Sequence, residues 1–84
     1  MTRNEIFRDI ERERRRQQTK WGKPHAWGVG DCSSLGVMPS TKSMVLSEEC
    51  GEVSRAVLDG DDNNLKTELI QVAAVAVAWL ESMN

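Results

Sequence analysis

The stretch that decides the fold runs from residue 48 to residue 71 and reads EECGEVSRAVLDGDDNNLKTELIQ. Each half carries acidic or amide side chains three positions apart, Glu49 with Glu52 and Glu68 with Gln71. That spacing places both members of a pair on one face of an α-helix, about one turn apart. On a helical wheel these faces coincide with the apolar side of each segment. Buried carboxylates must be neutralised, paired or bound to a metal, so the sequence predicts a site here.

The break between the two halves reads DGDDN at residues 59–63. Gly60 suits the residue after a helix end, and the Asp and Asn residues that follow suit the cap of the next helix. This predicts two antiparallel helices. At about 1.5 Å rise per residue, Glu52 lies roughly 9 Å before the break and Glu68 roughly 6 Å after it, so the two carboxylates face each other. Oxygen ligands without His or Cys nearby favour Mg²⁺ or Mn²⁺ over zinc.

The phrase EECGE, followed after fifteen residues by ELIQ, resembles the acidic motif of the MazG-like, all-α nucleoside triphosphate pyrophosphohydrolases. That motif is Glu-Glu-x-x-Glu, a variable spacer and Glu-x-x-Asp. Glu48, Glu49, Glu52 and Glu68 match it residue by residue, whereas Gln71 stands where the family has Asp. The resemblance implies a Mg²⁺-dependent enzyme, with Mn²⁺ as an alternative, that hydrolyses a ribo- or deoxynucleoside triphosphate to the monophosphate and pyrophosphate.

The resemblance also assigns roles to these residues. The implied catalytic group is Glu48, Glu49, Glu52 and Glu68, and the implied metal ligands are Glu49, Glu52, Glu68 and Gln71. An amide oxygen can bind a cation but brings no charge, so we expect weaker metal binding than with Asp. The alternative is a non-catalytic MazG-like helical module that binds a nucleotide or a protein partner. Gln71 favours this alternative, and the four retained Glu residues favour the enzyme.

Composition indicates one domain over residues 1–84 with a small core, since a chain this short buries only roughly 60–65% of its unfolded surface. The net charge of −2 is uneven, with +4 over residues 1–23 and −6 over residues 24–84. The longest apolar run, residues 72–80, is far below the ~18 residues of a membrane span. With no signal-peptide core and two cysteines far apart, we expect a cytoplasmic protein. Cys50 falls on an apolar face and is predicted to be packed.

Residues 2–20 are predicted to form the first helix. Ile6, Phe7 and Ile10 give it a thin apolar stripe, and a very polar, Arg-rich stretch follows. The simplest interpretation is a solvated helix with internal ion pairs, in which Glu11 contacts Arg14 and Arg15. Nucleic-acid binding by the Arg-rich stretch is an alternative, and the interspersed acidic residues weaken it. In a third interpretation, basic side chains reach nucleotide phosphates; the candidates are Arg12, Arg16, Lys20, Lys23 and Lys42.

The phrase KWGKPHAWG follows at residues 20–28 and holds two tryptophans and the only histidine. Gly and Pro end the helix here, so the aromatic residues lie in or beside a loop. They either pack under that loop or form a stacking surface. An Arg-rich helix running into KWG also resembles the opening of small phage-type members of the MazG-like family. That likeness implies a substrate-binding group of Lys20, Trp21, His25 and Trp27.

Residues 29–40 read as an irregular loop, after which Ser40 or Thr41 is predicted to cap a second helix over 41–58. The third helix, predicted over 64–82, is apolar nearly all round. Three short helices cannot cover it on every side, so we expect a second subunit to do so and Trp79 to be buried. The predicted fold is therefore an all-α bundle of three helices per chain, completed by oligomerisation as a homodimer or homotetramer.

Overall fold

A computed structural model of the protein describes residues 1–83. Three helices make up most of it: α1 at Arg3–Lys20, α2 at Pro39–Asp59 and α3 at Asp62–Glu81. The only strands in the described chain are two short ones, β1 at Pro24–His25 and β2 at Gly28–Val29. The prediction of a mostly helical fold with three helices is confirmed.

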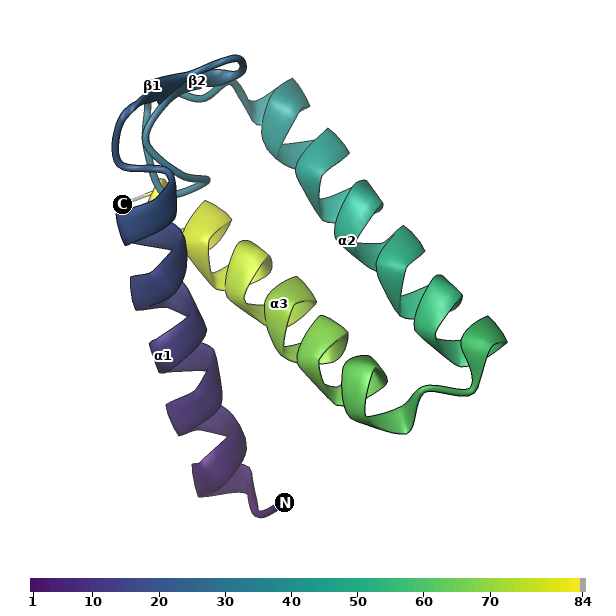
Figure 1. Ribbon diagram of the computed structural model, residues 1–84. Helices are drawn as coiled ribbons and strands as arrows, with labels where there is room; N and C mark the ends of the chain where they lie inside the picture. The colour runs from purple at the N-terminus through teal and green to yellow at the C-terminus, as the bar shows by residue number, and fades with distance from the viewer. Residues whose placement is uncertain (84) are drawn as a thin grey trace.

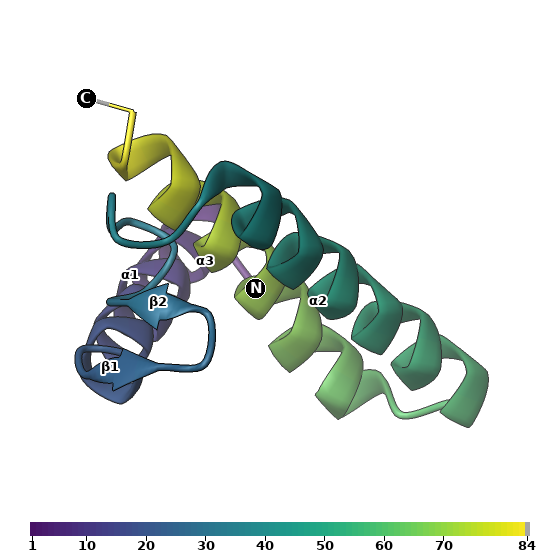
Figure 2. The ribbon, with the colours of Figure 1, turned by 90° about the horizontal axis from the view of Figure 1, so that it is seen from above.

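Helix α3 lies in the middle of the molecule (Figure 1). Both α1 and α2 pack against it, and within residues 1–83 they do not contact each other. The chain reverses between α2 and α3, which run side by side in opposite directions as predicted. Seen from above, the β1–β2 hairpin lies beside the C-terminal end of α1, far from the α2–α3 turn (Figure 2).

The helix ends agree with the predicted break but differ in detail. Gly60 ends α2 in the left-handed conformation with φ of 67°, and Asp61 caps α3 by accepting a hydrogen bond from the Asn64 N–H at 3.0 Å. Helix α2 begins earlier than expected because Pro39 occupies its first turn, where its fixed φ is favourable. The predicted Ser40 or Thr41 cap is therefore wrong; the cap residue is Met38, which makes no side-chain bond there.

The segment between α1 and α2 begins with a short hairpin and continues through residues 30–38, which form no helix or strand, as expected for most of the irregular loop predicted over residues 29–40. Strand β1 pairs with β2 in antiparallel register, with His25 opposite Gly28. Gly28 has φ of 139°, and a Cβ there would collide with the backbone of Gly36. Further on, Cys32 and Val37 are buried. This segment covers one end of the helical layer.

The core is small and centres on α3. Val75 and Ala78 pack with Cys32, and the partly buried Trp27, Val45 and Leu46 surround them. A core of this size leaves stability dependent on polar contacts as well.

Two predictions about burial are not met in the structure of the single chain. Cys50 is exposed rather than packed, so that prediction is wrong, and the buried cysteine is Cys32. Trp79 is only partly buried.

A sizeable apolar surface stays uncovered in the single chain. Leu69, Val77 and Leu80 of α3 are exposed, and so are Met44 and Leu58 of α2. Phe7 of the apolar stripe predicted for α1 is likewise exposed. Among the described residues, no helix is long and apolar enough to cross a membrane.

Candidate functional site

The acidic cluster consists of Glu49 and Glu52 on α2 and Glu68 on α3. A carboxylate oxygen from each lies within 4.8 Å of the others, as the antiparallel arrangement predicts. Glu68 is buried, Glu49 is partly buried and Glu52 is exposed. The expectation that Glu52 lies on a buried face is therefore wrong for the single chain, because only α3 packs against α2. The cluster is open to solvent on the Glu52 side.

The carboxylates of the acidic cluster repel one another and are partly shielded from water. Burial, a hydrogen bond to Glu52 and the charges of Glu52 and Glu49 raise the pKa of Glu68 to about 7. Burial and the neighbouring acidic charges, Glu52 first, raise the pKa of Glu49, although Arg16 partly offsets them. Such carboxylates are stabilised by a proton or by a cation. Carboxylates alone, with no His or Cys among them, form a donor set that suits Mg²⁺ or Mn²⁺.

Gln71 lies between the carboxylates. In the amide orientation that satisfies both of its polar atoms, the nitrogen donates to Glu68 Oε2 at 2.8 Å and to Glu49 Oε2 at 3.3 Å. The amide thus partly neutralises the cluster from within. To serve as a metal ligand, its oxygen must face the carboxylates instead, which requires the amide to rotate.

A cavity of about 190 Å³, the site cavity, adjoins the cluster. It brings together the two groups that the sequence singled out, because its lining includes Glu48, Glu49 and Gln71 of the first group and Lys20, Trp21 and Trp27 of the second. The remaining predicted residues Glu52, Glu68 and His25 do not line it. Its full lining is Glu13, Arg16, Gln17, Lys20, Trp21, Trp27, Asp31, Cys32, Val45, Glu48, Glu49, Gln71 and Val75.

Trp21, His25 and Trp27 form an aromatic cluster above α1. Their ring centroids lie 4.3–5.0 Å apart, with the His25 ring edge-on to both indoles. His25 Nε2 lies 2.7 Å from the carbonyl oxygen of Gly30, which fixes the ring, and the Lys20 ammonium stands 5.0 Å from the Trp21 centroid. The two interpretations of this phrase are thus compatible, since the indoles pack together and also line the site cavity.

Among the basic candidates for phosphate binding, Arg16 and Lys20 line the site cavity. Lys42 is buried at the start of α2 and does not reach that cavity. Arg12 and Lys23 also lie outside its lining.

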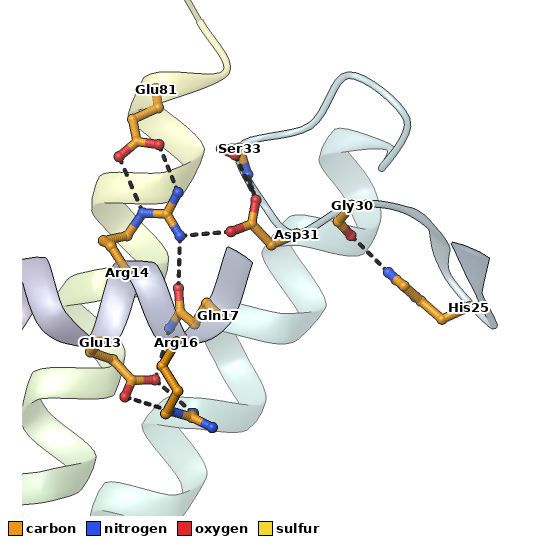
Figure 3. A network of polar contacts seen from close by, with 9 residues as sticks. All are labelled: Glu13, Arg14, Arg16, Gln17, His25, Gly30, Asp31, Ser33 and Glu81. Carbon is orange, nitrogen blue, oxygen red and sulfur yellow. Dashed lines mark hydrogen bonds and ion pairs between the residues drawn. The ribbon is translucent and has the colours of Figure 1, made fainter. Parts of the chain in front are cut away.

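The sequence did not reveal a buried ionic network around Arg14, which is shown in Figure 3. The guanidinium, 4% exposed, donates to Asp31 Oδ2 at 2.7 Å and to both carboxylate oxygens of Glu81 at 3.1 and 2.7 Å. The predicted pair of Glu11 with Arg14 is wrong, whereas the pair with Arg15 is confirmed at 3.0 Å. Arg14 therefore ties α1 to the loop and to the end of α3.

Two partners of Arg14 line the site cavity: Asp31, and Gln17, whose Oε1 accepts from the Arg14 guanidinium at 3.2 Å. Burial alone would raise the pKa of Asp31, but hydrogen bonds from Ser33 and Arg14 outweigh burial and hold the pKa below its ordinary value. Asp31 thus stays charged and fixed. The next residue, Cys32, has a raised pKa because the thiol is buried, with the charge of Asp31 adding to the effect.

Glu13 is a further residue that sequence reasoning did not single out. It lines the site cavity, is 11% exposed and binds Arg16 through two contacts of 2.8 and 2.7 Å (Figure 3). A signal was present, since Glu13 and Gln17 continue the i, i+4, i+7, i+11 spacing begun by Ile6 and Ile10. The inward-facing stripe of α1 therefore changes from apolar residues, Ile6 and Ile10, to polar residues, Glu13 and Gln17, where the helix reaches the site cavity.

Comparison with known proteins gives no relative: no protein-family model, no curated protein and no solved structure matches this chain.

Proposed function

We propose that this protein is a MazG-like nucleoside triphosphate pyrophosphohydrolase that depends on Mg²⁺ or Mn²⁺ and forms the monophosphate and pyrophosphate. The observation that carries the proposal is the site cavity, where the edge of the acidic cluster at Glu49 meets an aromatic and basic wall. A nucleotide combines an aromatic base with a cation-bound polyphosphate. The two walls match these two parts.

The residues fit a divalent cation. Glu49, Glu52 and Glu68 would hold it, since their oxygens lie within 4.8 Å of one another. Gln71 would add a neutral oxygen after its amide rotates, because its nitrogen faces Glu49 and Glu68. When bound, such an ion neutralises phosphate charge and lowers the pKa of a coordinated water. The repulsion that raises the pKa of Glu68 would then be relieved.

The remaining roles belong to side chains at the cavity wall. Trp21 and Trp27 offer indole surface to a base. His25 helps to hold residue 27 in place, because the backbone N–H of Trp27 donates to His25 Nδ1 at 3.4 Å. Lys20 would contact phosphate. Glu48 lines the cavity and is exposed, so it can accept the proton of the attacking water.

A second candidate is a nucleotide-binding module without turnover. The amide of Gln71, donating to Glu49 and Glu68, favours it, because the carboxylates then have an internal partner and less need of a cation. In this case a nucleotide would still occupy the site cavity.

The uncovered apolar surface motivates a proposal about assembly. A second copy of the chain that packs on Leu69, Val77 and Leu80 would remove from water side chains that are 37–62% exposed in the single chain. We therefore propose a homodimer or homotetramer. Light scattering that shows a stable monomer at micromolar concentration would contradict this.

The test is a screen of the common ribo- and deoxynucleoside triphosphates with Mg²⁺, in which pyrophosphate release is measured for wild type and Glu68→Gln. We expect release from at least one nucleotide with wild type and none with the variant. Calorimetric titration with Mn²⁺ separates the two candidates. Metal binding that Glu68→Gln abolishes supports the enzyme, and equal binding by both proteins excludes the cluster as a metal site.

A further inference from the structure

Glu13 and Arg16, one turn apart on α1, form the Glu13–Arg16 pair. Arg16 Nε and Nη2 contact the two oxygens of Glu13 at 2.8 and 2.7 Å, a bidentate arrangement that is among the stronger ion-pair geometries. Its partners differ in exposure, because the Glu13 side chain is 11% exposed and that of Arg16 51%. The carboxylate thus faces inward, and the guanidinium lies at the surface.

The pair separates two hollows. Both residues line the site cavity and also a larger hollow of about 580 Å³ between α1 and α3. Lys66 adds positive charge to this hollow, whereas Arg12 pairs there with Asp9 at 3.2 Å. The site cavity alone, at about 190 Å³, is smaller than the roughly 300–1,000 Å³ typical of small-molecule sites. A ligand as long as a nucleoside triphosphate therefore needs more room than this cavity provides. The larger hollow supplies that room directly behind the pair.

The charges near the Glu13–Arg16 pair are arranged so that ligand binding would favour the separation of Glu13 from Arg16. The charge of Glu13 adds to the repulsion within the acidic cluster, as its effect on Glu49 and Glu68 shows, and a divalent cation there would weaken that repulsion by offsetting most of the cluster's negative charge. Arg16 lies close enough to Glu49 for their charges to interact. A phosphate oxygen would compete with Glu13 for the same guanidinium donors.

We propose that Arg16 binds the phosphate oxygens of the ligand and that Glu13 is a positioning residue, which holds Arg16 when the site is empty and releases it toward phosphate when a cation binds the acidic cluster. The inference rests on the proposed polyphosphate ligand. The inference adds that cation binding and phosphate binding are coupled through the Glu13–Arg16 pair. The Glu13 carboxylate responds to the cation, and the same carboxylate restrains Arg16.

The test measures binding of inorganic tripolyphosphate by calorimetry, with and without Mg²⁺, in the full chain. Arg16→Ala should weaken binding about tenfold or more, as expected for the loss of charge-assisted hydrogen bonds, and Arg16→Lys should restore part of it. Glu13→Gln should bind several-fold tighter than wild type without Mg²⁺ and gain less from adding it. Arg15→Ala is the matched control, since Arg15 pairs with Glu11 on the same helix and lines neither hollow.

Three results would overturn the inference: no binding of tripolyphosphate to wild type, unchanged binding by Arg16→Ala, or weaker binding by Glu13→Gln. Because removal of the Glu13 charge by itself favours an anion, the discriminating measurement is the gain in affinity on adding Mg²⁺, which Glu13→Gln should lose in part and which a purely structural role would leave unchanged. Thermal melts of the conservative variants Arg16→Lys and Glu13→Gln show whether each is folded. Tripolyphosphate binding that depends on Arg16, without hydrolysis of any nucleotide, would sustain the inference while refuting the proposed enzyme.

Discussion

Two groups of charges in this molecule contrast sharply. In the acidic cluster, like charges are brought together, and the pKa of Glu68 rises to about 7. Around Arg14, opposite charges meet at 2.7 Å, and the pKa of Asp31 falls below its ordinary value. The Arg14 network is complete within the chain and serves stability. The acidic cluster lacks enough positive charge to balance its carboxylates, which is typical of sites that bind a ligand.

The largest effect should come from opening the Arg14 network. Arg14→Met leaves Asp31 buried without its cationic partner, and breaking a buried pair in this way costs roughly 3–5 kcal/mol. In a chain of this size that is a large share of the free energy of unfolding. Urea or thermal unfolding followed by circular dichroism measures it.

Arg15→Met is the matched control for Arg14→Met. The pair of Arg15 with Glu11 is exposed on both sides, and such pairs contribute about 0–1 kcal/mol. Equal unfolding midpoints for the two variants would mean that the buried network adds no more stability than a surface pair.

Trp21 and Trp27 of the aromatic cluster share the lining of the site cavity with Glu49 and Asp31, and Trp21 tests whether the cluster binds ligand. Trp21→Ala should weaken nucleotide binding by roughly 1–3 kcal/mol, the usual contribution of a base stacked on an aromatic ring. Trp27 packs against the core, so Trp27→Ala should lower the unfolding midpoint as well. Nucleotide binding with Mg²⁺ should also change tryptophan fluorescence, and a Trp21→Ala protein with wild-type affinity would limit the cluster to packing.

Repulsion in the acidic cluster predicts a pH dependence of stability. Because the pKa of Glu68 is about 7 in the folded chain and ordinarily 4.5, the folded chain retains a proton between these values that the unfolded chain has lost. Stability should therefore fall as pH rises from about 4.5 to 7.

Glu68→Gln imitates the protonated form and should lack this dependence. We expect it to be more stable than wild type at pH 8 by about 1–2 kcal/mol, since solvent on the Glu52 side screens the repulsion. At pH 4 the two proteins should unfold alike. If the free energies of unfolding of wild type and Glu68→Gln changed with pH in the same way across this range, the charge of Glu68 would not destabilise the folded chain.

The sequence predicted the acidic cluster because its contacts depend on local rules. Helical spacing places Glu49 beside Glu52, and the Gly60 break sets the height of Glu68 on the facing helix. The Arg14 network depends on positions 17 and 67 residues away, and no periodic pattern specifies those partners. The site cavity was foreseen only as two separate groups, since its closure depends on how residues 21–38 fold back over α1.

The two cysteines give the smallest and simplest contrast between the regions. Cys50 is exposed on α2 near the acidic cluster, whereas Cys32 is buried beside Asp31 and its pKa is raised by burial. Because the thiolate is the reactive form, a disulfide reagent should label Cys50 rapidly in the folded protein and Cys32 only on unfolding. Cys50→Ala should change stability by less than about 0.5 kcal/mol, as an exposed substitution does. It should abolish the fast phase, and fast labelling that persists in this variant would mean that residues 21–38 open readily and that the Arg14 network does not hold them closed.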